Sequence, residues 1–122
     1  MDLSKLEKYK RKYKAFDSKI ASLQGFLNDI DKSNVVQKVL QPYVLSRRLS
    51  IPELDIIFVL NLAEKEQLVH KAYKIWTIDD QYYLGEFSTP DAIPQKIRNN
   101  ETGEYVDREN FYASLVFEVS NE

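Results

Sequence analysis

The stretch LEKYKRKYKAFDSKIASLQGFLNDI, residues 6–30, decides the fold, because its apolar side chains recur in steps of three and four residues. The recurring residues are Leu6, Tyr9, Tyr13, Phe16, Ile20, Leu23, Leu27 and Ile30. A strand cannot place residues with this spacing on one face, whereas a helix with a 3.5-residue repeat aligns them along one seam. The spacing predicts one long amphipathic, coiled-coil-like helix whose seam needs a partner.

Aromatic rings fill three neighbouring layers of this seam, at Tyr9, Tyr13 and Phe16, where two-stranded coiled coils prefer aliphatic residues. Rings are rigid and bury a large area, so they often anchor interfaces. We therefore expect the seam to bind a protein partner or a second copy of the chain. The residues expected to make this contact are Leu6, Tyr9, Tyr13, Phe16, Ile20 and Leu23. The alternative is that the entire helix packs back on its own domain.

The second half of the predicted helix has a wider apolar stripe than the first. Phe26 adds to the seam after Leu23, as in helices that lie on a globular core. Gly25 lowers helix stability by up to about 1 kcal/mol and is a candidate bend. We expect the first half to project toward a partner and the second half to belong to the domain.

The charge of the chain is small overall but uneven along it. The 122 residues carry 17 Lys/Arg and 19 Asp/Glu, a net charge of −2, and 43% of them are hydrophobic, which is enough for a folded core. Residues 1–32 hold eight Lys/Arg against five Asp/Glu, which leaves −5 for the remainder. Any contact with nucleic acid would therefore be local.

Cysteine is absent, which excludes disulfides, thiolate metal ligands and a thiol nucleophile. The first residues lack the apolar run of a secretory signal, and no stretch approaches the roughly 20 apolar residues of a membrane span. We expect a cytoplasmic protein that makes no contact with a membrane.

Three further helices are expected after the first. Helical spacing predicts one over residues 35–44, which Pro42 would kink or end. A short helix is expected over residues 52–60, with a proline in its first turn. Asn61 begins a pattern that resembles a capping box and predicts a fourth helix over residues 61–74.

The C-terminal half is predicted to contain mainly β-structure. Residues 76–78 and 82–84 are rich in β-forming residues and flank the polar triplet 79–81, which predicts a hairpin. Residues 111–119 alternate between the two faces of a strand, with the aromatic and aliphatic side chains concentrated on one face.

This order of elements resembles that of a winged helix-turn-helix domain, here over residues 33–87. Such domains contain two short helices joined by a tight turn, preceded by a helix and followed by a hairpin. The segment LSIPEL at residues 49–54 is similar to the one that opens their second helix. The resemblance implies a three-helix core with a β hairpin.

A second resemblance concerns the tail of the chain. The segments LGEFSTPDAIP at residues 84–94, GEY at 103–105 and VFEV at 116–119 resemble the zinc-ribbon-type tail that follows winged-helix domains in some small bacterial defence and mobile-element proteins. The positions that match the zinc ligands hold Thr77, Asp80, Asn99 and Thr102, none of them Cys or His. The resemblance implies a tail that has lost its metal and is closed by aromatic side chains. These would be Tyr82, Tyr83, Phe87, Tyr105, Phe111 and Phe117.

The sequence thus predicts an α+β fold in three segments. Residues 1–32 form the long amphipathic helix, and residues 33–87 form the winged-helix-like core with its hairpin. Residues 88–122 form a small antiparallel sheet, a β tail packed on that core.

Residue patterns for catalysis are missing. His70 is the only histidine, so a catalytic triad or a histidine-rich metal site would depend on one ring. Asp79 and Asp80 fall in the predicted hairpin turn, where aspartate is favoured for local hydrogen bonds. The three glycines form neither a phosphate-binding loop nor a dinucleotide fingerprint. We expect no enzyme activity, metal, cofactor or small-molecule substrate.

Two functions remain as hypotheses. The first is a non-catalytic adaptor that self-associates or docks on a larger component through its N-terminal helix. The second is a transcriptional regulator that reads double-stranded DNA with the fourth helix. Its contacts would come from Gln67, His70, Lys71 and Lys74. Against the regulator, Glu66 shares that helical face and the domain is net acidic.

Overall fold

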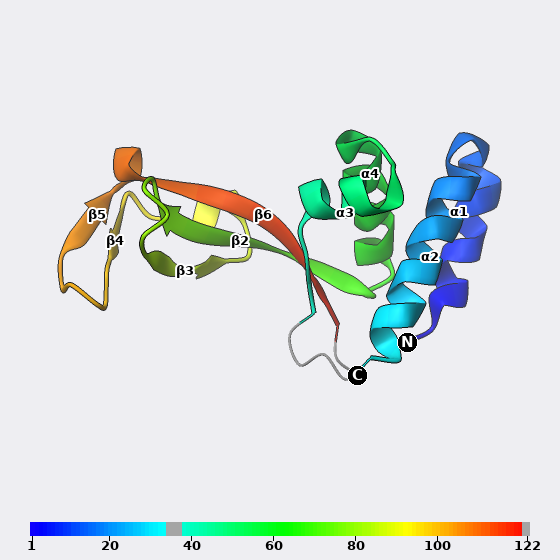
Figure 1. Cartoon of the computed structure of the whole chain (residues 1–122), viewed down its shortest axis with the longest axis horizontal. Helices are drawn as coiled ribbons and strands as arrows, with labels where there is room; N and C mark the ends of the chain where they lie inside the picture. Colours follow the sequence, from blue (N-terminus) through cyan, green and yellow to red (C-terminus); the bar gives the residue numbers. More distant parts are fainter. Residues whose placement is uncertain (34–37, 121–122) are drawn as a thin grey trace. The chain divides into compact units, whose positions relative to one another are not determined.

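The computed structural model of the chain describes residues 1–33 and 38–120. The fold is α+β, as predicted, with the α-helices in the first 65 residues and most strands after them (Figure 1). In the described part of the chain, four α-helices accompany one four-stranded and one two-stranded antiparallel sheet.

The first thirty residues form two helical arms. The first arm consists of the 3-10 turn η1 (Leu3–Leu6) and helix α1 (Glu7–Lys12). The chain then turns through a second 3-10 segment, η2 (Lys14–Phe16), into helix α2 (Asp17–Asp31). Figure 1 shows α1 and α2 lying side by side.

This hairpin replaces the single long helix that the sequence predicts, so that prediction is wrong. Helical geometry stops at Tyr13, whose φ is −119° and ψ 73°. The ammonium group of Met1 lies 3.4 Å from the carboxylate of Asp31, whereas a straight helix of this length would separate them by about 45 Å. The Gln24 side-chain amide likewise donates to the Leu3 carbonyl at 2.9 Å. A spacing of three and four defines one face of each helix, but it does not require the two helices to be collinear.

The next elements are strand β1 (Val39–Leu40) and helix α3 (Pro42–Leu49). The predicted helix over residues 35–44 is therefore wrong at Val39 and Leu40, and its first residues lie outside the described part of the chain. Pro42 starts α3 instead of kinking a longer helix, because its fixed φ suits a first helical turn and it lacks only an N–H that would be unpaired there.

Helix α4 (Glu53–Lys65) replaces the two helices predicted over residues 52–60 and 61–74. Asn61, taken as the cap of a new helix, lies inside α4. The chain leaves the helix at Gln67, which has a φ of 61°, and continues as strand β2 (Val69–Thr77). The spacing of the apolar residues predicts a helix through residue 74. The β-branched and aromatic side chains of this segment favour an extended backbone instead.

The predicted hairpin is confirmed: β2 pairs antiparallel with β3 (Tyr83–Phe87). The C-terminal strand is confirmed as β6 (Phe111–Val119). The four-stranded sheet has the order β1-β6-β2-β3, so β1 is a terminal strand. A second sheet pairs β4 (Lys96–Arg98) with β5 (Tyr105–Asp107). The 3-10 turns η3 (Pro90–Ala92) and η4 (Arg108–Asn110) connect these strands.

Contacts group the chain into two units, whereas the sequence suggested the segments 1–32, 33–87 and 88–122. The first unit holds residues 1–70 and 117–122, and the second holds residues 71–116. The four α-helices thus belong to the first unit.

The second unit has its own small core of Ile75, Ile93, Ile97 and Phe111. Of the rings expected to close it, Phe111 and Phe87 pack there, but Tyr83 and Tyr105 are 46% and 67% exposed. That part of the prediction is wrong, because isoleucines fill the space instead.

Candidate functional site

The seam of the first thirty residues lies inside the first unit. Leu6, Ile20 and Leu23 are at most 1% exposed, and Tyr9 is 8% exposed. Four of the six residues expected to bind a partner are therefore covered by the chain itself.

The other two seam residues, Tyr13 and Phe16, are half-buried against Phe58 of α4. Their ring centres lie 5.2 Å and 4.6 Å from that of Phe58. Lys19 of α2 adds an ion pair with Asp55 of α4 at 2.6 Å. The expectation that these rings project toward a partner is wrong, and the alternative, that the segment packs on its own domain, describes the observed packing.

Tyr9 also joins the hairpin to the end of α4 through a hydrogen bond. Its hydroxyl donates to the Glu66 carboxylate at 2.6 Å, and the Lys8 ammonium lies 3.1 Å from that carboxylate. The hydrogen bond, with burial and the negative charge of Glu66, raises the pKa of Tyr9 to about 12. The same hydrogen bond and Lys8 lower the pKa of Glu66. This cluster links the hairpin to the C-terminal end of α4.

The residues expected to read DNA do not share a helical face, so that premise is wrong. Gln67 lies in the turn after α4, and the other three lie on β2. His70 pairs with Glu118 at 3.3 Å, and Lys74 stands opposite Glu86 in the sheet with its ammonium 5.9 Å from the Tyr83 ring centre.

The acidic pair at the β2–β3 turn is engaged in local hydrogen bonds. Asp79 accepts from the Thr77 hydroxyl at 2.5 Å and from the Gln81 amide at 3.1 Å, and these bonds lower its pKa. Asp80 accepts from the Tyr112 hydroxyl. Within residues 1–33 and 38–120, no group of three or more His, Cys, Asp or Glu side chains is placed to hold a metal ion.

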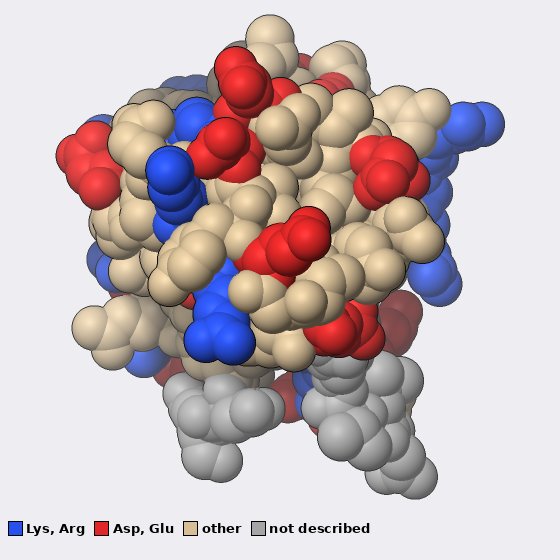
Figure 2. Space-filling view, turned by 90° about the vertical axis from the view of Figure 1, so that its left-hand side faces the viewer, with Lys and Arg blue, Asp and Glu red and all other residues tan. Residues whose placement is uncertain are grey.

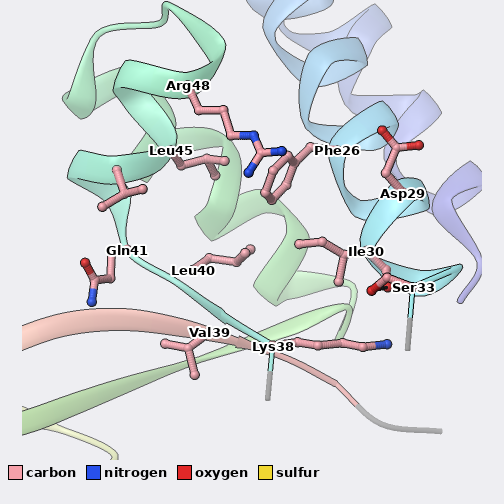
Figure 3. A pocket seen from close by; sticks show the side chains of 11 residues that line it. Phe26, Asp29, Ile30, Ser33, Lys38, Val39, Leu40, Gln41, Leu45 and Arg48 are labelled. Carbon is pink, nitrogen blue, oxygen red and sulfur yellow. Dashed lines mark hydrogen bonds between the residues drawn. The ribbon is translucent and has the colours of Figure 1, made fainter. Parts of the chain in front are cut away.

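A pocket of about 410 Å³ opens in the first unit between α2, β1 and α3. In Figure 3, Phe26 and Ile30 from α2, Leu40 from β1 and Leu45 from α3 surround a common space. The apolar lining consists of Phe26, Ile30, Val39, Leu40, Val44 and Leu45. This composition is typical of a site that receives apolar groups of a ligand.

The polar rim of the pocket is mainly cationic. Arg48 lies at its upper end and Lys38 at its lower end in Figure 3, and the Asp29 carboxylate points away from the centre. The Arg48 guanidinium carbon lies 5.2 Å from the ring centre of Phe26, so this cation covers part of the wall. The rim is completed by Ser33 and Gln41.

The charge balance of the second unit is acidic. Its sequence carries five Lys/Arg against eight Asp/Glu, a net charge of −3. Over the middle of the face seen in Figure 2, acidic and basic side chains are interspersed among uncharged residues, while blue side chains follow one another along the right-hand edge. The middle of that face offers no continuous basic patch for a phosphate backbone.

Comparison of the chain with protein-family models, with curated proteins and with solved structures found no match. Among the described helices, none is long and apolar enough to cross a bilayer.

The sequence contained one signal for this pocket. Phe26 stands outside the three-and-four repeat and widens the apolar stripe toward a second neighbour. That neighbour is α3. The sequence does not predict where α3 begins, because its spacing indicates one helix that already includes Val39 and Leu40.

Proposed function

We propose that the chain is a non-catalytic docking module and that the pocket between α2, β1 and α3 receives a segment of another protein. The observation that carries the proposal is the pocket's apolar lining, with Val44 of α3 54% exposed at its edge. An exposed apolar side chain beside an apolar hollow is typical of a site that a partner covers. The adaptor hypothesis is thus kept, with its contact moved from the N-terminal seam to the pocket.

The order of elements in the first unit supports a winged-helix-type body. Along the chain, α2 is followed by β1, then by α3 and α4, and then by β2. In the sheet, β6 lies between β1 and β2. In this interpretation the segment from β3 to β5 is an insertion between the two long strands. The body would resemble a winged helix whose wing has been enlarged.

Helix α4, which occupies the place of the reading helix in that interpretation, is poorly suited to DNA. Its first turn carries Glu53 and Asp55, which would repel phosphate. Phe58 is covered by the rings of the N-terminal hairpin, and Asp55 is paired with Lys19. Packing and charge therefore favour a protein partner over sequence-specific DNA binding.

Selection of a random-peptide display library on the full chain tests the proposal. Binders should lose affinity by about tenfold or more for the V44R variant, because a guanidinium would enter the apolar pocket. Leu54 of α4 is 80% exposed and does not line the pocket, so L54R is the matched control and should bind as the wild type does. Absence of binders, or binders equally sensitive to L54R, would contradict the proposal.

A second candidate function is contact with nucleic acid through the bend of the helical hairpin. Residues 8–14, KYKRKYK, hold five cations interleaved with two tyrosines. Lys8 and Lys10 are paired with carboxylates, but Arg11 and Lys14 are exposed at the end of the first arm. Duplex affinity that falls steeply with salt, and is lost in an R11E/K14E double variant, would support this function; affinity unchanged by the variant would exclude it.

A further inference from the structure

We infer that the segment bound by the pocket is extended, apolar in the middle and acidic at both ends. This inference rests on the proposed docking function and specifies the chemistry of the partner. It follows from three features of the pocket: its apolar depth, the position of its cations and the free edge of β1.

The depth of the pocket calls for apolar side chains. Its base is formed by Leu40 and Leu45, which are 5% and 2% exposed, and Phe26, Ile30 and Val39 form half-buried walls. None of these five side chains can hydrogen-bond to a ligand. A polar group placed here would lose its water without compensation, so aliphatic residues are the preferred occupants.

The two cations at opposite ends of the pocket call for carboxylates beyond those apolar residues. Among the residues that the structure describes, neither Arg48 nor Lys38 is paired with a carboxylate, and the Arg48 guanidinium lies over the face of Phe26. Arg47 adds another positive charge on α3 and donates to the Tyr43 hydroxyl at 3.1 Å. Asp29 contributes a negative charge, but its carboxylate points away from the centre of the pocket. The balance at the rim is positive and fits an acidic segment.

The edge of β1 calls for an extended backbone. The Lys38 carbonyl accepts from the Val119 amide at 2.9 Å, and Leu40 stands opposite Phe117 of β6. Because hydrogen-bonding direction alternates along an antiparallel pair, the N–H and C=O of Val39 point away from β6. Among residues 1–33 and 38–120, no strand pairs with this side of β1 in the sheet order. An added strand could pair with Val39 while its alternate side chains enter the pocket.

Three synthetic peptides test the charge preference on the full chain by titration calorimetry. All share a centre of alternating valine and threonine, and their ends carry glutamates, glutamines or lysines. The glutamate peptide should bind about fivefold more tightly than the glutamine peptide, the size expected for two partly exposed ion pairs. This advantage should shrink as salt is raised, and the lysine peptide should bind most weakly.

A charge-reversed chain provides the matched variant. In a K38E/R48E double variant the preference should invert, so that the lysine peptide binds best; a misfolded variant would bind none of the three. The control is K65E, whose exposed charge lies outside the pocket and which should keep the wild-type order. N-methylation of the peptide at alternate residues should weaken binding in one register only, since only one set of amides faces β1.

The outcomes separate this inference from the proposed function. Equal binding of the glutamate and glutamine peptides, with sensitivity to V44R, would overturn the acidic partner and leave the docking function standing. Sensitivity to N-methylation in neither register would overturn the extended strand. Failure of all three peptides, together with a library selection that yields binders sensitive to V44R, would also overturn the inference, whereas failure of both experiments would overturn the docking function itself.

Discussion

At the scale of single residues, the contact between Tyr9 and Glu66 decides how the hairpin is held to α4. The hydrogen bond favours the neutral phenol and the ionised carboxylate, so it raises the pKa of Tyr9 to about 12 and lowers that of Glu66. A carboxylate whose pKa is lower in the folded state stabilises the fold above its unfolded pKa, and this stabilisation is lost as pH falls through the folded value. A phenol whose pKa is raised stabilises the fold below pH 10, and this is lost as pH rises through about 12.

We therefore predict a pH-dependent difference between the wild type and E66Q. The free energy of unfolding, measured with urea, should be higher for the wild type at pH 7, and the difference should shrink below about pH 4 as Glu66 becomes protonated. E101Q, at an exposed position of a turn, should follow the wild-type curve. A difference between wild type and E66Q that is constant with pH would show that this pair does not form.

Two polar side chains, Thr77 and Asn99, are buried in the described part of the chain. Each lies at the start of a turn and accepts a hydrogen bond from an amide of that turn. Asn99 Oδ1 accepts from the Glu101 amide at 2.9 Å, and Thr77 Oγ1 accepts from the Tyr82 amide at 3.1 Å. Oxygen acceptors thus stabilise both turns locally, without a metal ligand at these positions.

Substitution of Asn99 by alanine should lower the free energy of unfolding by about 1–2 kcal/mol, because it leaves the Glu101 amide without its partner near a buried site. Asn100 is exposed in the same turn, so N100A should change stability by less than about 0.5 kcal/mol. Urea denaturation of both variants measures the difference. Equal stability of N99A and N100A would contradict the role given to the Asn99 side chain.

At the scale of elements, helix α2 is continuous through Gly25, so this residue does not interrupt the helix. A β-carbon at Gly25 would meet no atom within 4 Å, and the residue is exposed in a helix. G25A should therefore raise the free energy of unfolding by about 0.5–1 kcal/mol. Gly103 has a φ of 79°, so G103A should lower it by about 1 kcal/mol or more. Thermal unfolding of the pair checks both signs; destabilisation by G25A would contradict a continuous α2.

The sequence predicted the elements that are marked by alternating apolar residues and by turn residues. It did not predict where the chain reverses direction without such residues. The β2–β3 hairpin and strand β6 were found because alternation and turn residues are written in the chain itself. The reversal at Tyr13 was missed because neither glycine nor proline marks it, and both helices keep the same apolar repeat. The first part of strand β2, residues 69–74, was missed because its apolar residues also fit a helical face, and the β-branched residues that favour a strand were outweighed.

At the scale of the whole molecule, the proposed docking pocket exists only because α2, β1 and α3 pack next to one another. Its lining comes from three elements separated by loops, and the short strand β1 that joins them shows no alternation long enough to recognise. Only Phe26 gave a sequence signal, as an apolar residue outside the seam. The absence of a metal site and of an isolated catalytic pair remains a prediction from composition, while the proposed contact surface depends on packing between elements that are separated in the sequence.

The aromatic seam is covered within the chain, and the contact surface that we propose is therefore the pocket. Because the sequence has no cysteine, spin labels can be attached to a K5C/N28C variant, both positions being exposed. Pulsed dipolar spectroscopy should give a label separation of about 10–20 Å, because packed helices lie about 8–10 Å apart. A separation of about 35 Å, the length of a continuous helix between these residues, would contradict the helical hairpin and the covered seam.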